Sequence, residues 1–218
     1  MKSPLPFPLT AFCLCVLAAS LAQAADFRLV ALNQIKGLSR LEFIGPEGVE
    51  QVPVSIAHFS DSYKIPANGE VAFYDKAPAK GENKAPLFVV RFPENASDTI
   101  VLLGGQGDDG MYRYGLIDDS VHAFPTGSVY IMNFMKDPVM VKLGPTVVTV
   151  DSGARRIVPV IENKKEPFND GVKFATEING NAQVFSMSSW YLLPSMKIFC
   201  VIFPDKSGIP QIRRIRLT

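Results

Sequence analysis

Residues 197–218, KIFCVIFPDKSGIPQIRRIRLT, decide the fold class of this chain. A continuous apolar run covers residues 197–203, a turn segment contains Ser207-Gly208, and a second run rich in isoleucine covers residues 211–217. β-branched and aromatic residues on both sides of a glycine turn are typical of two neighbouring strands. The segment therefore predicts a strand, a tight turn and a second strand.

Short apolar runs of the same kind recur along the rest of the chain, separated by turn residues. The 17 Pro and 16 Gly are scattered between these runs rather than clustered, which leaves almost no room for long helices. The sequence therefore predicts an all-β protein. We expect strands at residues 27–32, 40–44, 52–58, 62–65, 70–74, 87–92, 99–103, 112–117, 128–134, 139–143, 147–150, 156–160, 172–176, 183–186, 190–193, 197–203 and 211–217.

The chain contains a degenerate internal repeat. Residues 99–120 align without gaps on residues 197–218. Residues 29–36 likewise resemble residues 129–136. The matched pairs include Ile100 with Ile198, Gly110 with Gly208, Ile117 with Ile215, Asn33 with Asn133 and Lys36 with Lys136. Identities are few, so the hydrophobic pattern and the repeated order support the repeat more than identity does.

The repeat predicts two tandem β-sandwich domains of the immunoglobulin-like kind, each of about seven strands. The alternative is a single larger β-sandwich with strands exchanged between the halves. Pro125 and Gly127 interrupt the alternation between the two series. We therefore place the first domain at residues 25–122, a linker at 123–127 and the second domain at 128–218, and we expect each domain to have its own core.

The N-terminal residues 1–24 have the features of a secretory signal peptide. Lys2 precedes an apolar run, and Ala22-Gln-Ala24 supplies a small-residue cleavage site. Proline, threonine and serine interrupt the run, whereas a membrane span needs about 20 consecutive apolar residues. We expect cleavage before Ala25, no membrane span in the mature chain, and an exported protein in the periplasm or outside the cell.

Charge and cysteine content exclude two further features. The chain has 22 basic and 21 acidic residues, and Lys2 is the one charge of the leader, so the mature chain has no net charge to attract nucleic acid. Cys13 and Cys15 belong to the leader, so Cys200 alone remains and no intramolecular disulfide can form. Its apolar surroundings predict a buried, reduced thiol.

The commonest catalytic and metal-binding groups are scarce. His58 and His122 are the only histidines, and the chain has no Cys-x-x-Cys, His-Glu-x-x-His or Gly-x-Ser-x-Gly motif. We expect both histidines to be ordinary surface residues. The sequence therefore assigns no catalytic residue, no cofactor-binding residue and no metal ligand.

Four carboxylates form the most polar cluster of the sequence: Asp108, Asp109, Asp118 and Asp119. They are candidates for a polar or cation site, because carboxylates beside glycine carbonyls suit calcium. The spacing does not match an EF-hand loop, and a hairpin turn requires the same residue types. Paired acids also carry glycoside hydrolysis, although a solvated acidic rim is the simpler interpretation.

The remaining candidates for a binding surface are Trp190 and Tyr191. Side chains alternate along a strand, so at most one of these two rings points outward. At the end of the chain, Arg213, Arg214 and Arg216 favour an edge strand whose charges discourage aggregation.

These observations favour an exported, non-catalytic β-sandwich protein that acts by surface recognition in the cell envelope or in a secreted assembly. Its partner would be a protein or a glycan. One alternative is a carboxylate-based glycan hydrolase or a glycan-binding protein. Another is a purely structural envelope subunit.

Overall fold

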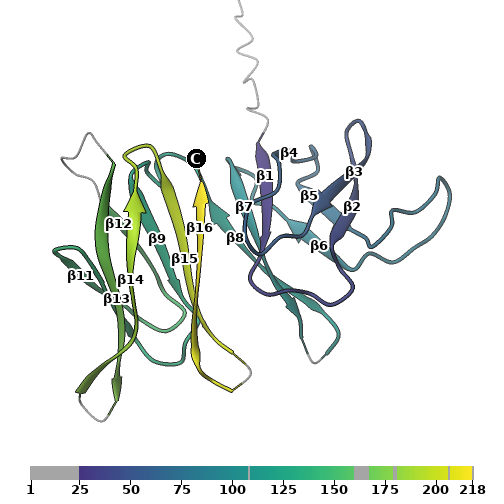
Figure 1. Ribbon diagram of the computed structural model, residues 1–218. Coiled ribbons are helices and arrows are strands. Elements are labelled where there is room, and N and C mark those ends of the chain that lie inside the picture. The colour runs from purple at the N-terminus through teal and green to yellow at the C-terminus, as the bar shows by residue number, and fades with distance from the viewer. Residues whose placement is uncertain (1–24, 108, 160–166, 179–180, 206, 218) are drawn as a thin grey trace, which may run out of the picture.

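The computed structural model describes residues 25–107, 109–159, 167–178, 181–205 and 207–217 (Figure 1). The regular elements in these ranges are all strands, which confirms the all-β prediction. The leader, with Cys13 and Cys15, and the candidate Asp108 lie outside the described residues. Within these residues, no helix is long and apolar enough to cross a membrane.

The first group of strands forms two layers. Its described strands are β1 (Asp26–Ala31), β2 (Arg40–Gly45), β3 (Gly48–Pro53), β4 (Tyr63–Lys64), β5 (Glu70–Phe73), β6 (Phe88–Arg91), β7 (Thr99–Gln106) and β8 (Tyr112–Asp118). One sheet has the order β4-β1-β7-β8, in which β1 and β7 are parallel. In the other layer β2 pairs with β3 and β5 with β6, and a bridge between Glu42 and Tyr74 joins the two pairs.

The second group repeats this arrangement. Its described strands are β9 (Ser128–Asn133), β10 (Val139–Leu143), β11 (Thr146–Val150), β12 (Arg155–Pro159), β13 (Phe168–Ile178), β14 (Asn181–Leu192), β15 (Lys197–Pro204) and β16 (Pro210–Leu217). One sheet has the order β12-β9-β15-β16, with β9 and β15 parallel, and the other has the order β11-β10-β13-β14.

Strand order is therefore the same in both groups when eight is added to each strand number. In the described residues, every ladder joins strands of the same group, and no sheet mixes strands from before residue 119 with strands from after residue 127. Each group contributes eight described strands rather than about seven. A duplicated sandwich would have this order, and the division into domains at 25–122 and 128–218 remains our proposal.

The strand bounds correct the alignment behind the repeat at one end. The bounds of β1 and β9 differ by 102 residues (128 − 26), so Ala31 rather than Asn33 corresponds to Asn133. Asn133 is fully buried, and its side-chain amide donates hydrogen bonds to the carbonyl oxygens of Asp137 and Val150. Asn33 is exposed, two residues beyond the end of β1. The matched asparagines therefore have different roles.

At the other end of the repeat, the β7–β8 turn aligns with the β15–β16 turn, but β7 is out of register with β15 by one residue in the ungapped alignment. Gly110 and Gly208 both have positive φ, 77° and 80°, at the β7–β8 and β15–β16 turns. A bulge between Leu103 and Gly105 adds one residue to β7. The ungapped alignment ignores this residue and pairs Val101 with Phe199. Val101 faces the core of its own group, whereas Phe199 faces the core between the two groups.

In the described part of the chain, four sheet layers enclose three hydrophobic cores. The first core lies between the sheet of β1 and the layer of β2, β3, β5 and β6, and it contains Phe27, Phe43 and Phe73. The second core lies between the sheet of β9 and the sheet of β10, and it contains Cys200 and Trp190. The central core packs the sheet of β1 against the sheet of β9. Its buried members are Val30, Leu32, Ile100, Leu102, Ile117, Phe124, Tyr130, Phe199, Val201, Phe203, Ile215 and Leu217.

The continuous apolar runs are explained by these layers. Alternation sends Cys200 into the second core and Val201 into the central core. A strand buried on both faces needs apolar residues at successive positions, as in a sheet covered on both sides. Phe124, in the segment assigned as a linker, is fully buried, and its ring centroid lies 5.3 Å from that of Tyr130. Phe124 therefore anchors this segment in the central core.

Two strand predictions are wrong in detail. The predicted strand 52–58 ends at Pro53, and Ser55 instead accepts hydrogen bonds from the backbone N–H groups of Ala57 and His58. A serine hydroxyl that binds nearby backbone competes in this way with a strand ladder. The two strands predicted at 183–186 and 190–193 are one strand, β14, that pairs with β13 along its whole length.

Candidate functional site

The structure does not bring the described acidic candidates together. Asp109 lies at the β7–β8 turn, where its carboxylate accepts from the N–H of Met111 at 3.0 Å and from Arg113 at 2.5 Å. Asp118 lies at the other end of β8. The seven residues of that strand separate the two carboxylates by roughly 20 Å. Among the described residues, no group of three or more His, Cys, Asp or Glu side chains is placed to hold a metal ion.

Asp118 acts as an ionised hydrogen-bond acceptor. It accepts from the Ser97 hydroxyl at 2.8 Å and from the Ser120 N–H at 2.9 Å. Burial pushes the pKa of Asp118 upward, but the hydrogen bonds from Ser120 and Ser97 outweigh burial and hold this pKa below its ordinary value. A carboxyl with a lowered pKa is poorly suited to act as a general acid at neutral pH.

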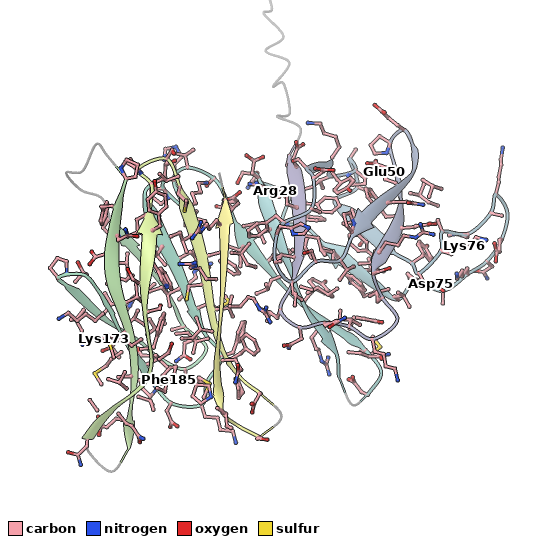
Figure 2. All side chains as sticks on the ribbon, viewed as in Figure 1. Arg28, Glu50, Asp75, Lys76, Lys173 and Phe185 are labelled. Atoms are coloured by element: carbon pink, nitrogen blue, oxygen red, sulfur yellow. The ribbon has the colours of Figure 1, made fainter. Side chains whose placement is uncertain are left out.

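Asp119 is buried and joins the two groups of sheets. Arg28 of β1 donates to Oδ2, and Lys197 of β15 donates to Oδ1 at 3.0 Å and to the backbone carbonyl oxygen at 2.8 Å. Arg28 lies where the two groups meet (Figure 2). The Lys197 ammonium also lies 5.2 Å from the centroid of the Phe124 ring. Both carboxylate oxygens are paired with cations, so Asp119 closes one end of the central core.

The aromatic candidates face opposite ways. Trp190 is buried in the second core, where its Nε1 donates to the Ser188 hydroxyl at 2.9 Å and the Arg214 guanidinium lies 5.0 Å from the ring centroid. Tyr191 is exposed. Only Tyr191 is therefore available to a partner.

The cysteine and the two histidines have ordinary environments. Cys200 is fully buried, and burial raises the pKa of its thiol to about 12, which confirms the predicted burial. His58 and His122 are both exposed. The His58 Nδ1 lies 3.2 Å from the Ser55 hydroxyl, which already accepts backbone N–H groups in a turn.

A cleft that the sequence did not reveal opens at the other end of the central core. It has a volume of about 890 Å³ and lies between the end of the β7–β8 hairpin and the end of the β15–β16 hairpin. The loop after β1 contributes to the same cleft. Its walls are mixed. The polar lining residues are Asn33, Gln34, Lys36, Gln106, Asp205, Gln211 and Arg213, and the others are Ile35, Gly104, Gly105, Phe203, Pro204 and Ile212.

The cleft carries unpaired positive charge. Neither Lys36 nor Arg213 has an ion-pair partner among the residues that the structure describes. The Arg213 Nε atom is buried and has no hydrogen-bond partner there. The carboxylate of Asp205 is already used, because Oδ1 accepts from the N–H groups of Ser207 and Ile209 at 2.8 and 2.9 Å. The cleft therefore offers cations to a ligand.

Alternation explains the position of Arg213. On β16 it shares a face with Ile215 and Leu217, which belong to the central core. This face of β16 continues beyond the central core into the cleft, where it carries Arg213.

An apolar pocket of about 310 Å³ shares part of the cleft wall. It shares Asn33, Gly104, Phe203 and Pro204 with the cleft. Two partly exposed rings, Tyr114 and Phe134, line it as well. Polar, cationic and aromatic groups thus border one continuous region.

No protein-family model and no curated protein sequence matches the chain. Its function is therefore inferred from the geometry of this region.

Proposed function

We propose that the protein is an exported recognition protein without catalytic activity, and that the cleft between the two groups of sheets binds an acidic glycan. The observation that carries the proposal is a cleft of about 890 Å³ with two cations, Lys36 and Arg213, that have no ion-pair partner in the described residues. A concave site with a few convergent polar groups is the usual place for a small ligand.

Each class of lining group suits one part of such a ligand. Arginine pairs with carboxylates in a planar, bidentate geometry, so Arg213 fits the carboxylate of a uronic acid. The side-chain amides of Asn33 and Gln34 can donate to and accept from sugar hydroxyls. The partly exposed rings of Tyr114 and Phe134 offer apolar faces on which a sugar ring can stack.

The positions of the acids favour binding over hydrolysis. Glycoside hydrolysis needs two carboxyl groups on either side of the scissile bond. Among the described residues that line the cleft and the pocket, Asp205 is the one carboxylate, and it is bound to backbone N–H groups. The described lining of this cleft thus gives a hydrolase no matching pair of acids.

Export is the second part of the proposal, and it rests on the leader in residues 1–24. Cleavage before Ala25 would leave the fold intact, since β1 begins at Asp26. We expect mass spectrometry of the exported protein to find Ala25 or Asp26 at the N-terminus. An exported form that keeps Met1 would contradict the proposal.

Glycan binding is tested by calorimetry on residues 25–218 with matched acidic and neutral oligosaccharides. We expect the uronic-acid ligand to bind and its neutral counterpart to bind more weakly. Replacing Arg213→Gln should weaken binding about ten-fold, because a charge-assisted hydrogen bond is lost. We expect no dependence on added calcium.

The matched control is Lys142→Gln, which removes an exposed cation from β10, outside the cleft lining. Equal binding of the acidic and neutral ligands, or equal losses in Arg213→Gln and Lys142→Gln, would contradict the proposed site.

A further inference from the structure

The outer edge of β14 lacks charge and proline, two features by which sheets usually avoid pairing with other chains. β14 is the last strand in the order β11-β10-β13-β14, and among the described residues no strand pairs with its outer side. Its sequence, NAQVFSMSSWYL over residues 181–192, contains no charged residue and no proline. Charge, proline and short length are the common protections of an edge strand.

Other long edges of the described sheets carry these protections. β16 carries three arginines, β12 carries two arginines and Pro159, and β3 carries Glu50 and Pro53. The opposite edge of the same sheet, β11, is uncharged as well, but it has five residues against the twelve of β14. Among these edges, β14 is the longest that carries neither a charged residue nor proline.

Large apolar side chains are exposed along β14. Val184 is 50% exposed, Met187 67% and Tyr191 44%. Met187 and Tyr191 are four residues apart, so they lie on the same face of the sheet, with Ser189 between them. Trp190 points the other way into the second core, where the Arg214 guanidinium lies against its ring. The outer face of this edge therefore exposes the apolar side chains of Met187 and Tyr191 and is free of that arginine.

A bulge limits the regular part of the edge. In the pairing with β13, Ser186 lies opposite Phe174 and Val184 opposite Ala175, so Phe185 is the extra residue. Figure 2 labels Phe185 on the β13–β14 hairpin. Bulges twist a strand and interrupt its ladder. The segment that can add a regular ladder is residues 186–192.

We propose that this segment pairs antiparallel with the same segment of a second copy of the chain, across a twofold axis at Ser189. An interface of this kind uses the same surface on both subunits and must be self-complementary. Residues 186–192 meet that condition, because the absence of charge means that no like charges oppose each other across the axis.

The register places compatible side chains opposite each other. With Ser189 on the axis, Met187 lies opposite the partner's Tyr191, and a thioether beside an aromatic ring is a favourable contact. On the inner face, Ser188 lies opposite the partner's Trp190. The nearest charged side chains on β13 are Lys173, opposite Met187, and Asp170, opposite Trp190, each about one strand spacing further in. The two four-stranded sheets would then form one continuous sheet.

Sedimentation equilibrium of residues 25–218 tests the proposal directly. We expect the mass to double with rising concentration and Ser189→Lys to remain a monomer, because two ammonium groups would meet on the axis. The matched control is Val147→Lys on the exposed opposite edge, β11, which should still form dimers. A wild-type chain that stays monomeric at several hundred micromolar, or dimers lost only in Val147→Lys, would overturn the proposal.

A second variant tests the register. Residues directly opposite in an antiparallel pair have Cα atoms about 4.5 to 5.5 Å apart, within the range that a disulfide bridges. Ser189→Cys should therefore give a covalent dimer when oxidised, and Cys200 should not compete because it is buried. Val147→Cys should stay monomeric under the same oxidant. Equal cross-linking of the two variants would contradict pairing through β14.

Discussion

The two ends of the central core differ in what their charged groups do. At one end, Asp119 pairs with Arg28 and Lys197, so each of these charged groups has a partner within the fold. At the other end, Lys36 and Arg213 line a cleft and have no ion-pair partner among the described residues. The comparison indicates that the closed end holds the two groups of sheets together and that the open end is available to a ligand.

The central core itself should give the largest effect. Separating residues 25–122 from residues 124–218 would expose its apolar face in both halves. Each buried side chain contributes about 1.5 to 3 kcal/mol of gross burial, so each half loses burial on the order of 10 kcal/mol, which the regained freedom of these side chains partly offsets.

We expect each half to keep β-type circular dichroism and to melt cooperatively below the full chain, because each has a core of its own. Each should also bind a hydrophobic dye that the full chain does not bind. Halves without any cooperative transition would contradict the tandem division and favour a single larger sandwich.

The closed end is tested by Asp119→Ala. This change leaves two cations without their acceptor, and breaking a buried ion pair costs about 3 kcal/mol or more. We expect the lower part of that range in urea unfolding, because the Arg28 side chain is 32% exposed and the Lys197 side chain 15% exposed. The neighbouring Asp118→Ala is the control and should cost less. Equal losses would show that Asp119 does not have this special role.

The sequence predicts most strands of this protein because alternation and glycine turns are local signals. The strand expected at 52–58 fails because the Ser55 hydroxyl binds the backbone two and three residues later, which hydrophobicity does not reveal. The ion pairs of Asp119 join residues 91 and 78 positions away. No local pattern could indicate these contacts.

The cleft was missed for the same reason, since its walls come from four separate segments. These are residues 33–36, 104–106, 203–205 and 211–213. A signal for the interface was nevertheless present. The unbroken apolar run at residues 198–203 indicates a strand buried on both faces, and a two-layer sandwich covers only one face of each sheet.

The second core gives a smaller, pH-dependent effect through Cys200. Burial raises the pKa of this thiol to about 12, whereas an unfolded cysteine has a pKa of about 8.5. The thiol's contribution to stability is therefore fully present below pH 8.5 and is lost as the pH rises toward 12, at about 1.4 kcal/mol per unit. Urea unfolding of Cys200→Ala should show a shallower loss between pH 8.5 and 10.5. Identical slopes, or rapid labelling of the native thiol at pH 8, would contradict its burial.

The open end should give the smallest effect on stability. In Arg213→Gln the buried Nε that has no hydrogen-bond partner in the described residues is removed, so the usual cost of losing a buried polar contact does not arise. Lys36→Gln changes an exposed side chain, and such changes usually alter the free energy of unfolding by about 0.5 kcal/mol or less. We expect urea unfolding of both variants to match the wild type within about that amount, while Arg213→Gln still weakens glycan binding. We expect the opposite result for Asp119→Ala. This variant should lose stability but still bind the glycan under conditions in which it is folded. If Arg213→Gln destabilises the protein as much as Asp119→Ala does, Arg213 serves the fold and the contrast between the two ends is wrong.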